Sequence, residues 1–265
     1  MNYQLFDWEC YRYDLFQFDG VGNLRGPDPR PLRSGGYMTA IGAAQTFGRF
    51  VEKPFTHQLR GATGMRLFDL STSAVAPSYF TSHGKIMGII NDSALCVVQI
   101  TAARSCGNSV YNNDKEHKNI FQMTADGPDG RFYNEHEIYE DLWKAGKIDE
   151  AKQLVEESKQ QWIVETRALL DAIKVPKILL WLSSRTPEYE PNPASYAAYA
   201  GEFPQYVNRE MVDAVRDAAD DYVEVISREG LPIQFPNRCT GAARACYLGS
   251  CYRTRHASSP SSPMH

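Results

Sequence analysis

The chain has 265 residues, of which 43% are hydrophobic and 23% are charged, and its formal net charge at pH 7 is -4. This composition excludes a mainly disordered, collagen-like or coiled-coil chain. The acidic balance argues against a protein that binds duplex DNA, because such a protein needs a basic face.

Hydropathy and cysteine content predict the compartment. No stretch approaches roughly 18 consecutive apolar residues, so we expect no transmembrane helix. The start, MNYQLFDWECYRYDLFQFDG, lacks the basic and apolar pattern of a signal peptide, which predicts a cytoplasmic protein. Six cysteines are too few for a disulfide scaffold, so we expect free thiols.

The first segment, residues 1–37, has an aromatic start followed by many glycines and prolines. Such residues interrupt regular elements, so the segment is predicted to be a loop-like N-terminal arm that packs on the main body. The main domain is predicted to span residues 38–265.

Strand and helix patterns alternate from there on. Apolar runs predict strands at 37–43, at the start of 65–77 and at 94–101, and helical patterns follow the first two of them at 45–64 and 78–92.

The second half of the domain begins with a polar and helical insertion around residues 104–172. Its first part, 104–134, is rich in Asn and Asp and is predicted to be a long loop, and 135–172 predicts two helices. The remaining predicted elements are a strand at 177–185, a helix at 208–222, a strand at 223–227 and loops from Arg228.

This alternation predicts a three-layer α/β fold with a mainly parallel central sheet. Sheets of this kind hold their ligands at the carboxyl ends of the strands. The loops Gly42–Thr46, Ser71–Pro77, Thr101–Asn108 and Ser183–Pro187 are therefore expected to converge on one edge.

Four short blocks carry a family resemblance. GAAQTFG, from Gly42 to Gly48, resembles the first block of the SGNH hydrolases, Gly-Asp-Ser-x-Thr-x-Gly, with Ala44 where that family has its nucleophilic serine. FDLSTSAVAP resembles the second block, with Ser71 and Ala74 at its two glycine positions. Asn108 is the loose counterpart of the third block, and His265 stands where the family has its catalytic histidine.

The resemblance, which holds for the order and spacing of the blocks over most of the chain, implies a three-layer SGNH/flavodoxin-like fold. The chain best resembles a bacterial domain family of unknown function with an SGNH-like core. Its members read similarly at GAAQTFGRFVEKPF, FPQYVNREMVDAV and the terminal SPMH.

The chemistry of an SGNH hydrolase does not follow from the resemblance, because the methyl group of Ala44 cannot attack a carbonyl. Three alternatives stay open. Thr46 is the nucleophile, or the site transfers an acyl group directly between two bound substrates, with His265 as base and the amides near Ala44 and Ala74 as oxyanion donors. Otherwise the site only binds.

Further polar residues of the edge loops are candidate substrate contacts. Gln45 is predicted to hold a substrate hydroxyl or carbonyl, or else to cap the following helix. Arg104 and Arg185 are predicted to clamp an anionic group, with Asn108 and Ser184 beside them. In the structural alternatives, Arg104 links the insertion to the main body of the domain, and Ser184 and Arg185 belong to a solvated strand end.

The C-terminal region offers a weak metal pattern. Cys239, Cys246, Cys251 and His256 approach a three-Cys, one-His zinc site but lack a C-x-x-C pair, so we expect no zinc. Arginines in the same region leave a zinc-stabilised, RNA-associated protein as an alternative. No phosphate-binding glycine motif is present in the sequence, so no ATP or dinucleotide cofactor is expected.

Together these features predict an SGNH-like hydrolase or acyltransferase that acts on an acylated or otherwise substituted carbohydrate or small metabolite. Acetyl-coenzyme A is a candidate acyl donor. The main alternative is a non-catalytic module that binds a glycan or an anion. The sequence predicts no oligomeric state.

Overall fold

A computed structural model describes residues 13–113, 120–123, 132–229, 233–236 and 243–246. The chain divides into two compact units, Met1–Arg228 and Glu229–His265. The boundary falls inside the region that the sequence pattern groups as one domain, 38–265.

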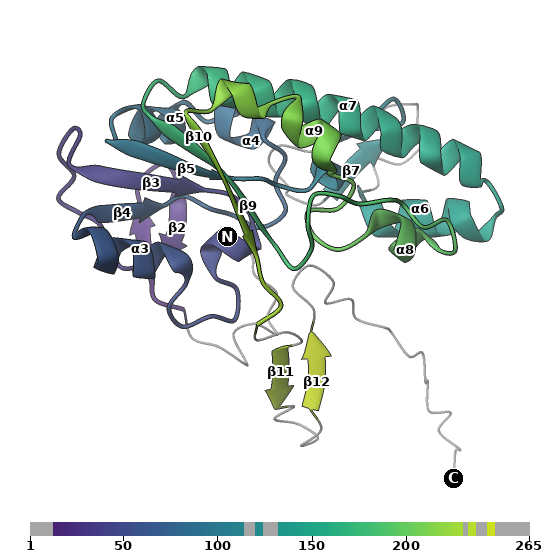
Figure 1. The fold of residues 1–265 in the computed structure, drawn as a ribbon, viewed down its shortest axis with the longest axis horizontal. Helices are drawn as coiled ribbons and strands as arrows, with labels where there is room; N and C mark the ends of the chain where they lie inside the picture. The colour runs from purple at the N-terminus through teal and green to yellow at the C-terminus, as the bar shows by residue number, and fades with distance from the viewer. Residues whose placement is uncertain (1–12, 114–119, 124–131, 230–232, 237–242, 247–265) are drawn as a thin grey trace, which may run out of the picture. The chain divides into compact units, whose positions relative to one another are not determined.

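The first unit is built on a seven-stranded sheet with the order β1-β2-β4-β3-β5-β9-β10 (Figure 1). Its strands are β1 (Leu15–Phe18), β2 (Gly22–Arg25), β3 (Tyr37–Ile41), β4 (Arg66–Asp69), β5 (Leu95–Gln99), β9 (Lys177–Ser183) and β10 (Asp221–Ile226). The strands β4, β3, β5, β9 and β10 are parallel to one another, whereas β2 is antiparallel to both β1 and β4. The predicted three-layer α/β fold with a mainly parallel sheet is confirmed.

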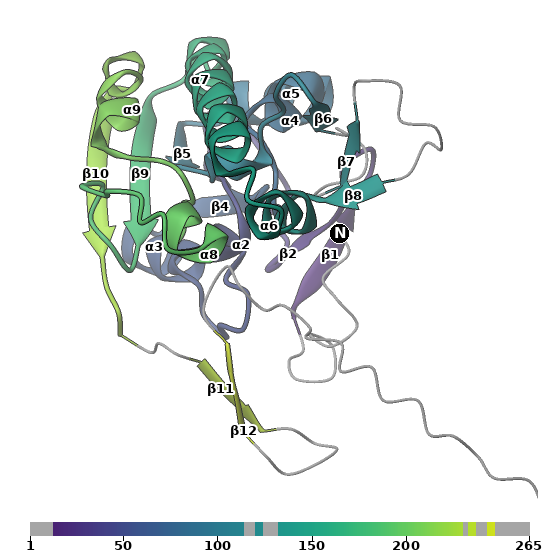
Figure 2. The ribbon, with the colours of Figure 1, turned by 90° about the vertical axis from the view of Figure 1, so that its right-hand side faces the viewer.

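Helices cover both faces of the sheet, with α4, α5 and α7 on one side and α2 and α3 on the other (Figure 2). The helical elements are α2 (Ala44–Phe47), α3 (Phe55–Thr63), α4 (Ser78–Ser82), α5 (Gly84–Asn91), η1 (Ala103–Ser105), α6 (Glu135–Lys144), α7 (Ile148–Ala172), α8 (Tyr196–Ala200), α9 (Arg209–Asp213) and η2 (Arg216–Ala218). Neighbouring strand residues point to opposite faces, so Ile41 and Val98 join the large core under α7. Ala40 and Val97 join the smaller core on the α3 side.

The predicted N-terminal arm contains a β-hairpin. β1 and β2 pair with each other, and Arg25 of β2 lies opposite Asp69 of β4, so the hairpin extends the sheet. The glycine-rich sequence was expected to form loops, but two strands of four residues each fit between its turns. Residues 1–12 lie outside the described residues.

Two of the predicted helices are interrupted. The first divides into α2 and α3, because Gly48 has a φ of 70° and ends α2, and Pro54 precedes α3. The second divides into α4 and α5 at His83, whose φ and ψ of -105° and 89° are not helical.

The predicted insertion has two structural parts. The polar stretch 104–134 is not only a loop, because it contains a three-stranded antiparallel sheet of β6 (Tyr111–Asn113), β7 (Ile120–Met123) and β8 (Phe132–Asn134). The helices α6 and α7 follow, and the buried side of α7, including Trp162 and Leu170, completes the large core.

The end of the chain departs from the sequence pattern as well. The predicted helix 208–222 is shorter in the structure, where α9 and η2 are followed by β10 from Asp221. In the second unit, β11 (Ile233–Pro236) pairs with β12 (Ala243–Cys246) in an antiparallel hairpin where loops were expected.

Among the described residues, no helix has both the length and the apolar character needed to cross a membrane.

Candidate functional site at the carboxyl edge of the sheet

The segments that follow β3, β4, β5 and β9 meet at the carboxyl edge of the sheet. Thr72 N–H donates to Gly42 O at 3.1 Å, which joins the loops after β4 and β3. Ala103 N–H donates to Gln205 O at 3.1 Å, and the side chains of Ala43, Ala102 and Phe203 form one buried cluster. The four candidate loops therefore converge, together with the segment 202–207 that follows α8.

The turn after β3 is packed against Gln99, the last residue of β5. Gln99 Oε1 accepts hydrogen bonds from Ala43 N–H at 3.0 Å and from Thr46 Oγ1 at 2.6 Å. A Cβ atom on Gly42 would approach Gln99 Oε1 and Thr46 Oγ1 to 2.5 Å. Glycine is needed at position 42 because the turn and the end of β5 lie so close together.

Among the described residues, no base lies beside the hydroxyl group of Thr46. The side chain is buried, and its Oγ1 donates to the oxygen of a carboxamide, which cannot remove a proton as a histidine would. Ala44, the residue at the nucleophile position of the SGNH resemblance, begins α2 and is half-buried.

Three glutamine side chains at this edge hold a buried polar atom that has no hydrogen-bond partner among the described residues. These atoms are Gln45 Oε1, Gln99 Nε2 and Gln205 Oε1. The three residues lie on the three segments that Ala43, Ala102 and Phe203 bring into contact. An unsatisfied buried polar atom costs about 1–3 kcal/mol, so a ligand or an ordered water would stabilise this arrangement.

The loop after β4 begins at a buried carboxyl group. Asp69 accepts hydrogen bonds from Ser71 N–H at 3.0 Å, from the Ser71 hydroxyl and from Thr56 Oγ1 at 3.2 Å. Burial raises the pKa of Asp69 to about 6, although these bonds and the nearby Arg25 act in the opposite direction. Ser71 is fully buried, so its hydroxyl group stabilises the loop and is not available at the surface.

Ala74 has a φ of 48°, in the left-handed region that favours glycine. The SGNH resemblance has glycine at this position, so the backbone adopts a conformation that suits the residue found in that family. The loop that carries Ala74 is bonded to Gly42 through Thr72.

The guanidinium group of Arg185 donates hydrogen bonds to backbone carbonyl groups. Its Nε donates to Glu202 O at 3.1 Å, and its Nη2 donates to both Pro204 O and Val207 O at 2.7 Å. Burial lowers the pKa of Arg185 to about 10. These contacts give Arg185 the role of fixing the segment 202–207, and Ser184 Oγ donates to Glu202 Oε2 at 2.5 Å beside it.

The two remaining candidates, Arg104 and Asn108, both lie on the segment that follows β5. Arg104 is half-buried on η1, directly after β5. Asn108 instead faces the helices, where its Nδ2 donates to Tyr139 Oη at 3.2 Å and to Ser158 Oγ at 3.3 Å. Asn108 therefore links the loop after β5 to α6 and α7.

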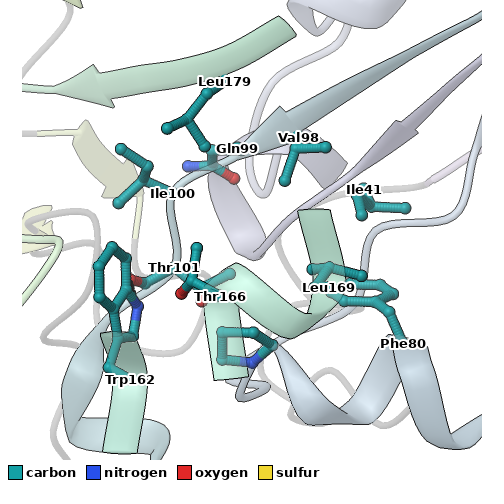
Figure 3. A pocket seen from close by; sticks show the side chains of 11 residues that line it. Ile41, Phe80, Val98, Gln99, Ile100, Thr101, Trp162, Thr166, Leu169 and Leu179 are labelled. Atoms are coloured by element: carbon teal, nitrogen blue, oxygen red, sulfur yellow. Dashed lines mark hydrogen bonds between the residues drawn. The ribbon is translucent and has the colours of Figure 1, made fainter. Parts of the chain in front are cut away.

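A small cavity lies behind the edge, between the sheet and α7 (Figure 3). Thr101 and Thr166 line it, and the Oγ1 atoms of both are buried and have no hydrogen-bond partner in the part of the chain that the structure describes. Trp162 Nε1 donates to Thr101 O at 2.9 Å and holds the wall. The space open to the centre of a water molecule is about 10 Å³, which suits one water between the two hydroxyl groups.

A family model matches residues 1–124 and 133–246, and its description is Domain of unknown function (DUF6473). The chain belongs to the DUF6473 family. The match confirms the predicted membership of a domain family of unknown function. No curated protein matched this DUF6473 chain.

The predicted metal pattern of the DUF6473 chain cannot be placed. Cys239, Cys251 and His256 lie outside the described residues, as does His265, and Cys246 is described only as part of β12. Among the residues that the structure describes, no group of His, Cys, Asp and Glu has a geometry that could hold a metal ion.

Sequence reasoning missed three residues of this DUF6473 edge: Gln99, Gln205 and Asp69. Gln99 and Asp69 each carried a signal, because each is a polar residue at the end of an apolar strand pattern. Gln205 carried none, since its place depends on the path of the chain after α8.

Proposed function

We propose that this DUF6473 protein has an SGNH-like core and binds a neutral small ligand, a carbohydrate or an acylated metabolite, at the carboxyl edge of its sheet. The observation that carries the proposal is the group of three carboxamides, Gln45, Gln99 and Gln205, each with an unpartnered buried atom. Carboxamides both donate and accept hydrogen bonds, which matches the hydroxyl and carbonyl groups of such a ligand.

The charge of the edge favours a neutral ligand over an anion. The nitrogen atoms of Arg185 point to backbone carbonyl groups of residues 186, 202, 204 and 207, so this guanidinium already has its acceptors. The predicted clamp of Arg104 and Arg185 on an anion is therefore less well supported than binding through the carboxamides.

The binding proposal requires no covalent intermediate. Ala44 offers a methyl group, and the hydroxyl of Thr46 is buried against Gln99. Bacterial origin and a cytoplasmic location stay predictions from the sequence.

Direct acyl transfer between two bound substrates is the second candidate function. The left-handed backbone of Ala74 favours it, because this conformation agrees with the SGNH block whose amide donates to the oxyanion. In this case acetyl-coenzyme A is the candidate donor and His265 the candidate base. A screen of acetyl-coenzyme A with sugar acceptors tests it, and turnover that is lost in His265→Ala would support it.

Ligand-induced stabilisation of the purified chain tests the binding proposal. We expect a saturable rise in melting temperature with one or more neutral or acetylated sugars, because a ligand at 100 times its dissociation constant stabilises the folded state by about 2.7 kcal/mol. Phosphate and sulfate should give a smaller rise.

Substitution of the glutamines makes the test specific to the site. Gln45→Leu and Gln205→Leu should abolish the rise. Gln58→Leu, at an exposed position on α3, should keep it. A rise with anions alone, or an unchanged rise in both site variants, would contradict the proposal.

A further inference from the structure

The strand β10 is an edge of the seven-stranded sheet, and it pairs only with β9 among the strands that the structure describes (Figure 2). Its sequence, DYVEVI, contains no lysine or proline, and no bulge interrupts its register with β9. Natural edge strands usually carry such features to prevent pairing with another chain. β10 lacks these features, and its two charged residues, Asp221 and Glu224, are both acidic.

Three apolar side chains of β10 are exposed: Val223 (38%), Val225 (41%) and Ile226 (44%). Val223 lies beside Leu180 and Val225 beside Leu182, so the two valines continue the apolar face on the α3 side of the sheet. A parallel sheet normally has both of its faces covered. Within the described part of the first unit, the α3-side face is covered at β4, where α3 packs, and Val223 and Val225 are exposed at β10.

The backbone of β10 also offers hydrogen-bonding groups to a neighbour. Ser227 N–H donates to Ser183 O at 3.0 Å. Because alternate residues of a strand direct their N–H and C=O groups to the same side, this bond places those of Val223 and Val225 toward β9. The corresponding groups of Tyr222, Glu224 and Ile226 then point outward.

We propose that two copies of this chain associate through β10, in antiparallel pairing, to form one continuous sheet. With Glu224 opposite its own counterpart, Val223 of each copy lies opposite Val225 of the other on the α3-side face. The outward N–H and C=O groups of Tyr222 then meet those of the second copy's Ile226.

Charge supports the same register. Asp220 and Arg228, at the two ends of the strand and both exposed, lie opposite each other in this pairing, and Arg228 also pairs with Glu202 of its own chain. The two Glu224 residues meet at the centre, where Arg209 of each chain pairs with both Glu224 and Glu188 of that chain. The opposite charges of Asp220 and Arg228 at the two ends favour a second copy as the occupant of this edge.

The mass of the full-length chain in solution tests the proposal. Sedimentation velocity and light scattering should give twice the mass of one chain at high concentration. Val225→Lys places a charge directly beside Val223 of the second copy and should give a monomer. Val164→Lys is the matched control, because Val164 is 62% exposed on α7, and it should stay dimeric.

A second variant tests the backbone hydrogen bonds of the proposed pairing. Glu224→Pro removes an outward N–H without a loss of pairing to β9 and should also give a monomer. Circular dichroism checks that each variant is folded. If neither variant folds, hydrogen exchange of the wild-type chain decides, since the Glu224 amide should be protected at high concentration and exchange rapidly on dilution.

A monomeric wild-type chain over the whole concentration range would overturn the proposal. Folded Val225→Lys and Glu224→Pro variants that both remain dimeric would overturn it as well, because the dimer would then use another surface. A Glu224 amide that exchanges rapidly in a dimeric sample would also overturn the proposal.

Discussion

The carboxyl group of Asp69 lies at the end of β4 with 4% of the residue exposed, and its pKa is raised from 3.8 to about 6 by burial. Between these values the unfolded chain loses the proton while the folded chain keeps it. The free energy of unfolding therefore falls as the pH rises from about 4 to about 6 and does not recover above that range.

We predict that Asp69→Asn removes this pH dependence. At about 1.4 kcal/mol per pKa unit, the difference in unfolding free energy between wild type and Asp69→Asn should change by roughly 3 kcal/mol between pH 4 and pH 7, in favour of the variant at the higher pH. Urea unfolding at both pH values measures the difference.

Asp217→Asn provides the control with the opposite sign. Hydrogen bonds from Arg167 lower the pKa of Asp217, so the stability from this exposed pair is lost as the pH falls. An Asp69→Asn difference that is constant with pH would show that the buried carboxyl group does not titrate in this range.

At the scale of single elements, the turn after β3 has no space for an added side chain, whereas helix α3 has. A Cβ atom on Gly42 would lie 2.5 Å from two side-chain oxygens, whereas one on Gly61 of α3 would meet no atom within 4 Å. The same substitution at the two glycines should therefore have opposite effects.

We predict that Gly42→Ala destabilises the protein by about 1–3 kcal/mol through overpacking. Gly61→Ala should stabilise it by up to about 1 kcal/mol, because alanine is the better helix former. Thermal unfolding of the two variants measures both effects. Equal effects of the two substitutions would mean that the turn relaxes to accept a side chain.

The elements themselves could be predicted from the sequence where they are long or apolar. The buried strands at 94–101 and 177–185 and the helical region 135–172 were found because their apolar residues recur at the spacing of a strand or a helix. The hairpin at 15–25 and the small sheet within 104–134 were missed, because strands of three or four residues show no such period.

Only part of the site could be predicted from the sequence: the loops that form it, but not the partners of their side chains. The carboxyl edge follows from the α/β order, so the loops could be chosen in advance. The partners of each side chain depend on packing between distant segments, as Arg185 shows by bonding to Pro204 and Val207 and Asn108 by turning to Ser158. No local pattern encodes such contacts.

At the scale of the whole molecule, the described core belongs to the first unit. Both the sheet and the large core under α7 lie within Met1–Arg228. A unit with its own core is expected to fold alone.

We predict that a chain ending at Arg228 unfolds cooperatively with nearly the melting temperature of the full chain. Calorimetry of both forms measures this. Loss of cooperative unfolding in the shorter chain would mean that residues 229–265 are required for the first unit to fold. The shorter chain would also test His265, because acyl transfer that needs this residue must disappear while the fold remains.

Local opening of the first unit can be followed by alkylation of two buried thiols. Cys96 lies within β5 and Cys106 lies under α7, where Ser158 Oγ donates to Cys106 O at 3.3 Å. Burial raises the pKa of Cys96 to about 12 and that of Cys106 well above its usual value, and alkylation requires the thiolate. A reagent therefore reaches each sulfur only when its surroundings separate, so the alkylation rate at Cys96 reports opening of the sheet and the rate at Cys106 reports release of α7.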